Sequence, residues 1–136
     1  MTSVPDDLVR TTRRLYALFA EGNVPGLLAM LQPDVEWAEP ENPFNPAGGT
    51  RHGHAGVVEW LTVGHASEEI LSLEPRIILT APDTVAVVGT STCRVRSTGR
   101  TYTTEFVHVI RFRDGKVAGF REYFDTFAAA EAFRPR

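Results

Sequence analysis

The sequence contains a single cysteine, Cys93, so no disulfide bond can form within the chain. Cys93 lies in a stretch where apolar and polar residues alternate, a setting typical of a small buried side chain and not of a reactive thiol. The sequence also lacks an apolar stretch long enough to span a bilayer, and its first residues lack the basic and apolar regions of a secretory signal. We therefore expect a cytoplasmic protein that does not contact a membrane.

Positive charge is scarce as well. The chain has 14 lysine and arginine residues against 17 aspartate and glutamate residues, which gives a formal net charge of −3. The arginines are scattered, whereas a protein that binds a phosphate backbone usually carries a basic patch. We expect no nucleic-acid partner.

The remaining composition is that of an ordinary globular protein. Hydrophobic residues make up 43% and charged residues 23% of the 136 residues. A chain of this length can bury a substantial core, and it shows no repeat or linker. We expect one domain over residues 1–136.

Helical signals occupy the N-terminal part of the sequence. Ser3 and Asp6, three residues apart, are typical of a helix start, and apolar residues then recur at helical spacing as far as Phe19. Gly22 ends this helix, and Asn23 can cap a second, leucine-rich helix.

The next segment mixes short elements with turn residues. Val35 to Trp37 is typical of a short strand, and a third helix is expected to begin near Ala55. Between them, residues 39–53 are rich in proline, glycine and asparagine, which predicts an irregular loop. We expect this loop to form the mouth of a pocket.

From Ile70 onward the apolar pattern has a period of two. Turn residues separate four stretches of this kind, which predicts an antiparallel meander. Helices followed by hairpins indicate an α+β fold, in which the helices cover one face of the sheet. The predicted strands are Leu71 to Leu79, Val85 to Val95, Thr101 to Phe112 and Lys116 to Phe124.

Two polar residues interrupt apolar strand faces. His108 lies at the centre of the apolar face of its strand, and Glu122 lies between Phe120 and Phe124 on the next strand. A buried imidazole without a hydrogen-bond partner would cost about 1–3 kcal/mol, so His108 must be hydrogen-bonded or functional. A carboxylate between two phenylalanines is harder still to explain as structure.

The turn between these strands decides whether the two residues share a face. A two-residue turn at Asp114 and Gly115 would place them on opposite faces. A bulged turn with Gly115 in the left-handed position would place His108 opposite Phe120, and Glu122 opposite Phe106. We favour the bulged turn, because it gathers the aromatic residues and both polar groups on one face.

A buried carboxylate has its pKa raised by desolvation, which suits a general acid or base near neutral pH. A histidine beside it could polarise a carbonyl group or carry a proton. The alternative is structural: Glu122 would pair with an arginine such as Arg121 or Arg94, and His108 would be a satisfied core residue.

The sequence resembles the SnoaL-like branch of the nuclear-transport-factor-2-like superfamily, which includes polyketide cyclases and ketosteroid isomerase. The likeness covers almost the whole chain, and its most specific part is residues 113–125. The resemblance implies a cone-shaped fold with N-terminal helices packed on a curved antiparallel sheet. It implies little about the reaction, because the superfamily hosts many activities and many binding proteins.

The resemblance suggests roles for individual residues. Polyketide cyclases use a histidine and an aspartate on adjacent strands, where this chain has His108 and Glu122. The tyrosine of the isomerases would fall beside Tyr16, and Glu39 is the nearest match to their general base, two positions late. The offset at Tyr16 argues against a true steroid isomerase, and the epoxide hydrolases are excluded because their strand residues are replaced, one of them by Ser91.

The spacing of His52 and His54 is also seen in metal sites. No second motif of suitable spacing supports such a site, so we expect neither a metal nor a cofactor.

The leading hypothesis is an enzyme that performs acid–base chemistry next to a carbonyl group of a small, apolar, cyclic or polyketide-like molecule, as a cyclase, isomerase or dehydratase. A ligand-binding or dimerisation module without chemistry is the alternative. His108 and Glu122 would be catalytic, and the substrate would contact Tyr16, Trp37, Glu39, Trp60, Phe106, Ile110, Phe120 and Phe124.

We further expect a homodimer through the outer face of the sheet, which is too apolar to be left wholly wet. The residues expected on that face are Thr92, Arg94, Thr103, Val107, Val109 and Arg121.

Overall fold

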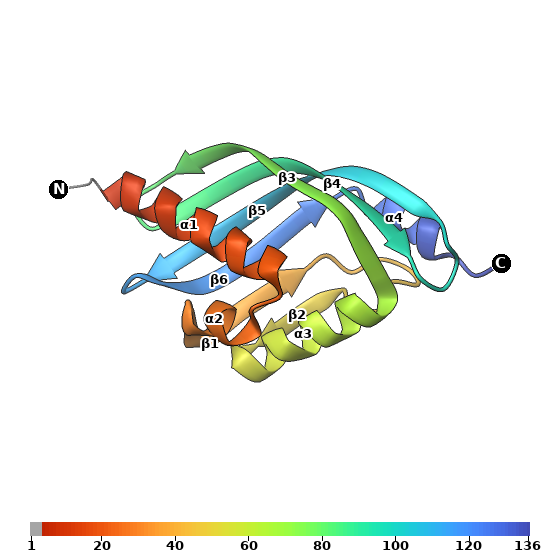
Figure 1. Ribbon diagram of the computed structural model, residues 1–136, viewed down its shortest axis with the longest axis horizontal. Helices are drawn as coiled ribbons and strands as arrows, with labels where there is room; N and C mark the ends of the chain where they lie inside the picture. The colour runs from red at the N-terminus through yellow and green to blue at the C-terminus, as the bar shows by residue number, and fades with distance from the viewer. Residues whose placement is uncertain (1–3) are drawn as a thin grey trace.

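The computed structural model describes residues 4–136 and has the α+β architecture that the sequence predicts; the expected cap residue Ser3 lies outside the described residues. Within residues 4–136, six strands form one sheet in the order β2-β1-β6-β5-β4-β3 (Figure 1). β1 and β6 run parallel, and the other neighbours are antiparallel. The strands are β1 (Leu31–Glu39), β2 (Gly49–His52), β3 (Glu68–Thr80), β4 (Thr84–Val95), β5 (Thr101–Arg113) and β6 (Lys116–Phe124).

The helices α1 (Val4–Glu21), α2 (Val24–Ala29) and α3 (Gly53–Ser67) pack on one face of this sheet. Figure 1 shows α1 crossing the sheet, while the long, bent β3 leads away from the end of α3. None of the helices in the described part of the chain is long and apolar enough to cross a bilayer.

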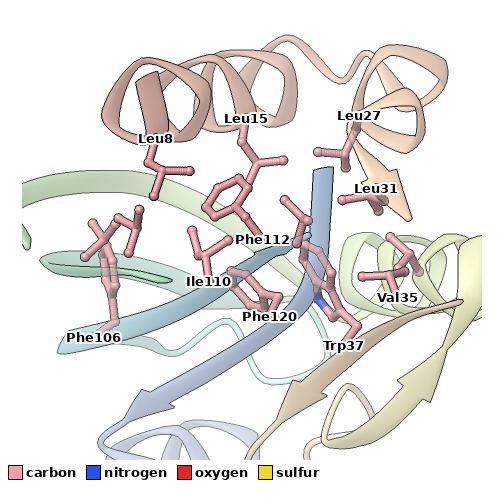
Figure 2. Packing of buried hydrophobic residues seen from close by; sticks show 14 residues of the cluster. Leu8, Leu15, Leu27, Leu31, Val35, Trp37, Phe106, Ile110, Phe112 and Phe120 are labelled. Carbon is pink, nitrogen blue, oxygen red and sulfur yellow. The ribbon is translucent and has the colours of Figure 1, made fainter. Parts of the chain in front are cut away.

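A continuous apolar core joins the helices to the inner face of the sheet. Leu8 and Leu15 lie on the buried side of α1, at helical spacing, and Leu27 is the buried residue of α2. Figure 2 shows these leucines pointing toward side chains of the sheet, among them Phe106 and Ile110. Each large apolar side chain buried in this way contributes about 1.5–3 kcal/mol.

Asn23 caps α2 as predicted: its Oδ1 accepts a hydrogen bond from the backbone N–H of Gly26 at 2.9 Å. Two other elements were not predicted. β2 (Gly49–His52) lies inside the segment expected to be irregular, because four residues are too few to show a period. α4 (Thr126–Phe133) follows β6, and Asp125 caps it by accepting a hydrogen bond from the N–H of Ala128 at 3.0 Å.

The predicted register of the β5–β6 hairpin is wrong. Asp114 and Gly115 both have positive φ, 52° and 77°, so they form the two-residue turn that had been the less favoured alternative. The bulge lies farther along β6, where Ala118 is the extra residue between the pairs Phe112–Val117 and Arg111–Gly119.

The displaced bulge has a direct consequence for the two polar residues. A two-residue turn alone would have placed them on opposite faces, and the extra residue in β6 reverses the faces beyond it. His108 therefore lies directly opposite Glu122, and Phe106 lies opposite Phe124. The two polar groups share the inner face, as expected, but they are closer than the predicted diagonal arrangement.

Candidate functional site

A cavity of about 980 Å³ lies between the helices and the inner face of the sheet. Its wall also includes Pro40, Asn45, Ala47 and Gly48 from the segment expected at the pocket mouth. The predicted site residues that line the cavity are Tyr16, Trp37, Glu39, Trp60, His108, Phe120, Glu122 and Phe124.

Two predicted contact residues lie elsewhere. Phe106 and Ile110 are 1% and 0% exposed and belong to the core instead of the cavity wall. Phe106 stacks on the ring of His108, with the ring centroids 4.2 Å apart. Phe106 therefore supports the imidazole ring from the core, and not as part of the cavity wall.

Three side chains from three different elements form a hydrogen-bonded chain. The hydroxyl of Tyr16, on α1, lies 2.5 Å from Nδ1 of His108, on β5. Nε2 of the same imidazole lies 2.5 Å from Oε2 of Glu122, on β6. Both ring nitrogens of His108 are thus engaged within the protein.

The protonation of Glu122 follows from its partners. Burial would raise the pKa of Glu122, but hydrogen bonds with His108 and Glu39 outweigh burial, so the pKa lies below its ordinary value. The raised pKa expected from the sequence is therefore wrong in direction. Glu122 is a carboxylate near neutral pH, and because a carboxylate only accepts hydrogen bonds, Nε2 of His108 donates.

The other end of the chain is neutral. Burial, and then the negative charge of Glu122, raise the pKa of Tyr16. Tyr16 therefore stays protonated, and its hydroxyl can donate a hydrogen bond to Nδ1. Nε2 then donates a hydrogen bond to Glu122, as in a neutral imidazole. In this arrangement Tyr16 donates a hydrogen bond to His108, and His108 donates one to Glu122.

Glu39 supplies a second carboxyl group beside the first. The parallel pairing of Ala38 with Arg121 places Glu39 next to Glu122. Burial, the charge of Glu122 and a hydrogen bond with Glu122 raise the pKa of Glu39 well above its ordinary value. A protonated carboxylic acid thus adjoins a carboxylate, and such divergence is the usual mark of an acid and a base with separate roles.

Two buried polar atoms at this site have no hydrogen-bond partner within residues 4–136. They are Oε1 of Glu39 and Nε1 of Trp37, two residues apart on the inner face of β1. Unpaired buried groups are rare in folded proteins and are often associated with function.

Aromatic rings form the wall next to the acid pair. Trp37 stacks on Phe120, with centroids 4.1 Å apart and planes 11° apart, and Trp60 lies 5.1 Å from Trp37. These rings exclude water and lower the local dielectric, which strengthens the electrostatic interactions at Glu39 and Glu122.

The alternative in which Glu122 forms an ion pair with Arg121 or Arg94 is not supported. Arg94 pairs with Glu69 at 3.5 Å, and Arg121 is exposed, on the opposite face of β6 from Glu122. The partner of Glu122 is His108, whose side chain is 7% exposed.

The two histidines considered as metal ligands do not meet. Nε2 of His54 lies 3.0 Å from the carbonyl oxygen of Leu31, whereas His52 is exposed at the start of α3. Among the described residues, no three His, Cys, Asp or Glu side chains are grouped so as to hold a metal ion.

A second polar group in the cavity was missed from the sequence. The hydroxyl of Tyr102, on β5, donates to Oε2 of Glu68, at the start of β3, at 2.6 Å. Cys93 lies beside them, and burial, the first of several causes, raises its pKa to about 12, so the thiol stays protonated. The alternation on β5 places Tyr102 on the inner face, but nothing in the sequence places Glu68 beside it.

Comparisons with known proteins agree with this architecture. The model of the SnoaL-like domain family matches residues 12–120. No curated protein sequence matches the chain. The chain belongs to the SnoaL-like family, and the resemblance and the cone-shaped fold expected from the sequence are confirmed.

Three solved structures show how close the likeness is. An NTF2-like protein from Burkholderia xenovorans LB400 is 36% identical, with a TM-score of 0.87, over 95% of this chain and 97% of its own. An NTF2-like protein from Burkholderia pseudomallei K96243 is 30% identical, with a TM-score of 0.86, over 98% and 100%. TerC, co-crystallised with polyporic acid, is 34% identical, with a TM-score of 0.80, over 96% and 98%.

Proposed function

We propose that this protein is an enzyme that moves a proton at a carbon next to a carbonyl group of a small, cyclic, largely apolar molecule. The observation that carries the proposal is the adjacent pair Glu122 and Glu39, whose pKa values are displaced in opposite directions inside one cavity. Acid and base are then both supplied by the chain, so the proposed reaction needs no cofactor.

In the proposed mechanism Glu122 is the base. Its carboxylate removes the proton from the carbon, and the electron pair of the C–H bond moves toward the carbonyl oxygen to form an enolate. Glu39 donates a hydrogen bond or its proton to that oxygen. The enolate then attacks a second carbonyl group, recovers a proton elsewhere, or expels a hydroxyl group, which are the cyclase, isomerase and dehydratase outcomes.

His108 and Tyr16 act as positioning residues in this mechanism. Because both nitrogens of His108 are bonded within the protein, the imidazole orients Glu122 and does not reach the enolate oxygen directly. This differs from the direct role in catalysis expected for His108 from the sequence. Tyr16 in turn fixes which nitrogen of His108 carries the proton.

The substrate class is argued from the cavity wall. Stacked Trp37 and Phe120, with Trp60 and Phe124, favour a flat, apolar ring system. The related TerC was co-crystallised with polyporic acid.

The proposal can be tested before the natural substrate is known. We expect the protein to accelerate solvent deuterium exchange at the carbon next to the carbonyl of a cyclic ketone such as 1-tetralone, followed by nuclear magnetic resonance. Glu122→Gln should reduce this acceleration by about 100-fold, the usual contribution of a general base. A series of cyclic ketones that bind in the cavity but exchange no faster than in buffer would overturn the proposal.

One observation favours the alternative, a ligand-binding module without chemistry. Every polar group of the Tyr16–His108–Glu122 chain is already paired within the protein, which is also what a purely structural network needs. The deuterium-exchange experiment separates the two functions, because binding alone does not accelerate exchange.

We also propose that two copies associate through the outer face of the sheet. Large apolar side chains are exposed there: Ile77 and Leu79 on β3 are 52% and 58% exposed, and Tyr123 on β6 is 52% exposed. Val107 and Val109 lie partly buried between them. A second copy would cover this surface.

A further inference from the structure

The cavity contains a second polar position, formed by Glu68 and Tyr102, which takes no part in the proposed reaction. Glu68 begins β3, directly after α3, and Tyr102 lies near the start of β5. Both side chains line the same cavity as Glu122, and both are partly buried.

The hydrogen bonding of Glu68 is incomplete. Tyr102 donates its hydroxyl proton to Oε2, and Oε1 of Glu68 receives no hydrogen bond from any residue of the described chain. Glu68 also forms no ion pair with a lysine, arginine or histidine in residues 4–136. A carboxyl group placed in a partly buried wall without a cation is costly to the fold, so it calls for an explanation other than stability.

The cavity wall near Glu68 combines apolar side chains with a few polar ones, among them His65, Glu69 and Arg96. Ile70, Leu71 and Leu73 follow Glu68 on β3, and Phe124 lies on β6. Burial, the largest effect, and the charge of Glu122 raise the pKa of Glu68, although the hydrogen bond from Tyr102 opposes them.

The two polar positions line different parts of the same cavity. Tyr102 and His108 are six positions apart on β5, about 20 Å of strand at 3.3 Å per residue. The charge of Glu122 nevertheless contributes to the raised pKa of Glu68, and both carboxyl groups line the same cavity. A molecule of two fused rings could therefore contact both positions at once.

We propose that Glu68 and Tyr102 form a specificity subsite for a hydroxyl group at the end of the ligand opposite its carbonyl group. Tyr102 donates to Oε2, and in the carboxylate form of Glu68 the free oxygen Oε1 also accepts, so the matching ligand group is a donor. The inference rests on the proposed function only for placing the carbonyl group at Glu122 and Glu39. The ligand class is then an elongated, apolar hydroxyketone.

The test compares two fluorescent probes, 6-hydroxy-2-acetonaphthone and 6-methoxy-2-acetonaphthone, which differ only in whether the distal oxygen can donate. Equilibrium titration of the wild-type protein should show that the hydroxyl compound binds about tenfold or more tightly, the usual effect of a hydrogen bond to a charged group. No turnover is required for this measurement.

Two variants assign the preference to the subsite. Glu68→Gln should abolish it, because the amide oxygen would accept from Tyr102 and leave the donor NH₂ toward the ligand. Tyr102→Phe should reduce it, because Glu68 loses the group that orients it. The matched controls are Glu74→Gln and Tyr123→Phe, which lie outside the cavity and are exposed, and both should keep the full preference.

Equal affinities for the two probes in the wild-type protein would overturn the inference, as would a preference that survives Glu68→Gln or failure of both probes to bind. These outcomes are distinct from failure of the proposed function. A hydroxyl preference lost in Glu68→Gln, with no acceleration of deuterium exchange, would uphold the subsite and reject the catalytic proposal.

Discussion

The hydroxyl of Tyr16 lies 2.5 Å from Nδ1 of His108, although 92 positions separate the two residues in the sequence. Nε2 of His108 makes a second bond of the same length, to Glu122. The imidazole is thus fixed from both sides, by a residue of the helical layer and by a residue of the sheet. A side chain held in this way presents the neighbouring carboxylate in one orientation.

Glu122→Gln is expected to lower the rate of deuterium exchange by about 100-fold per folded molecule. The lowered pKa of Glu122 in the wild-type protein means that its charged form stabilises the fold. The variant should therefore also be less stable, by about 1–3 kcal/mol. Denaturant unfolding checks the stability and the exchange assay checks the rate. Loss of stability with unchanged exchange per folded molecule would assign Glu122 a structural role only.

The pH dependence of stability should differ in sign at the two carboxyl groups. The pKa of Glu122 is lowered on folding, so its contribution is present above its unfolded pKa and is lost as the pH falls through the folded value. The pKa of Glu39 is raised, so its contribution is present below its unfolded pKa and is lost as the pH rises through the folded value. Glu39→Gln should therefore stabilise the protein relative to wild type at high pH and not at low pH. Melting temperatures measured across the pH range check this, and a stabilisation that does not depend on pH would contradict it.

Tyr16→Phe should remove the bond to Nδ1 without emptying the space. We expect about a tenfold loss of exchange activity, together with a change in the ¹⁵N chemical shifts of His108 that reports a different tautomer. Tyr123→Phe, on the exposed outer face, is the matched control and should change neither quantity. Unchanged ¹⁵N shifts in Tyr16→Phe would show that Tyr16 does not set the protonation of His108.

Gly89→Ala tests the support behind the imidazole. A Cβ atom at Gly89 would lie 2.5 Å from Cζ of Phe106 and would also meet the backbone oxygen of Glu74. We expect a loss of about 1–3 kcal/mol in unfolding free energy, as in other overpacked cores. Gly64→Ala is the control, because a Cβ atom there meets nothing within 4 Å, and it should be neutral or stabilising. Equal stabilities of the two variants would contradict the close packing of Phe106.

The proposed association through the outer face predicts a dimer in light scattering at micromolar concentration. Val107→Glu should shift the mass toward the monomer, because Val107 lies in the middle strands of that face, opposite Val88 and Tyr123. The exchange rate per chain should change little, since Val107 does not line the cavity. A wild-type protein that scatters as a monomer would contradict the proposed dimer.

Local patterns in the sequence determined much of this protein. The period of two identified β3 to β6, and the cap at Asn23 located the start of α2. His108 and Glu122 stood out because each is a polar residue on an apolar strand face, a property that depends only on alternation along one strand. These features rest on interactions between residues that are near neighbours in the sequence.

The tertiary structure decided how those residues meet. One unpaired residue, Ala118, set which side chain of β6 faces His108; the neighbouring Gly119 is a local sign of a bulge, but it does not by itself show which pairing the bulge displaces. The strand order and the packing of helices on the curved sheet bring together residues that are far apart in the sequence. The pairs are Glu39 with Glu122, Tyr16 with His108, and Glu68 with Tyr102. Because the pKa of a buried group depends on these long-range neighbours, the sequence could select the carboxyl groups but could not show which is the acid and which the base.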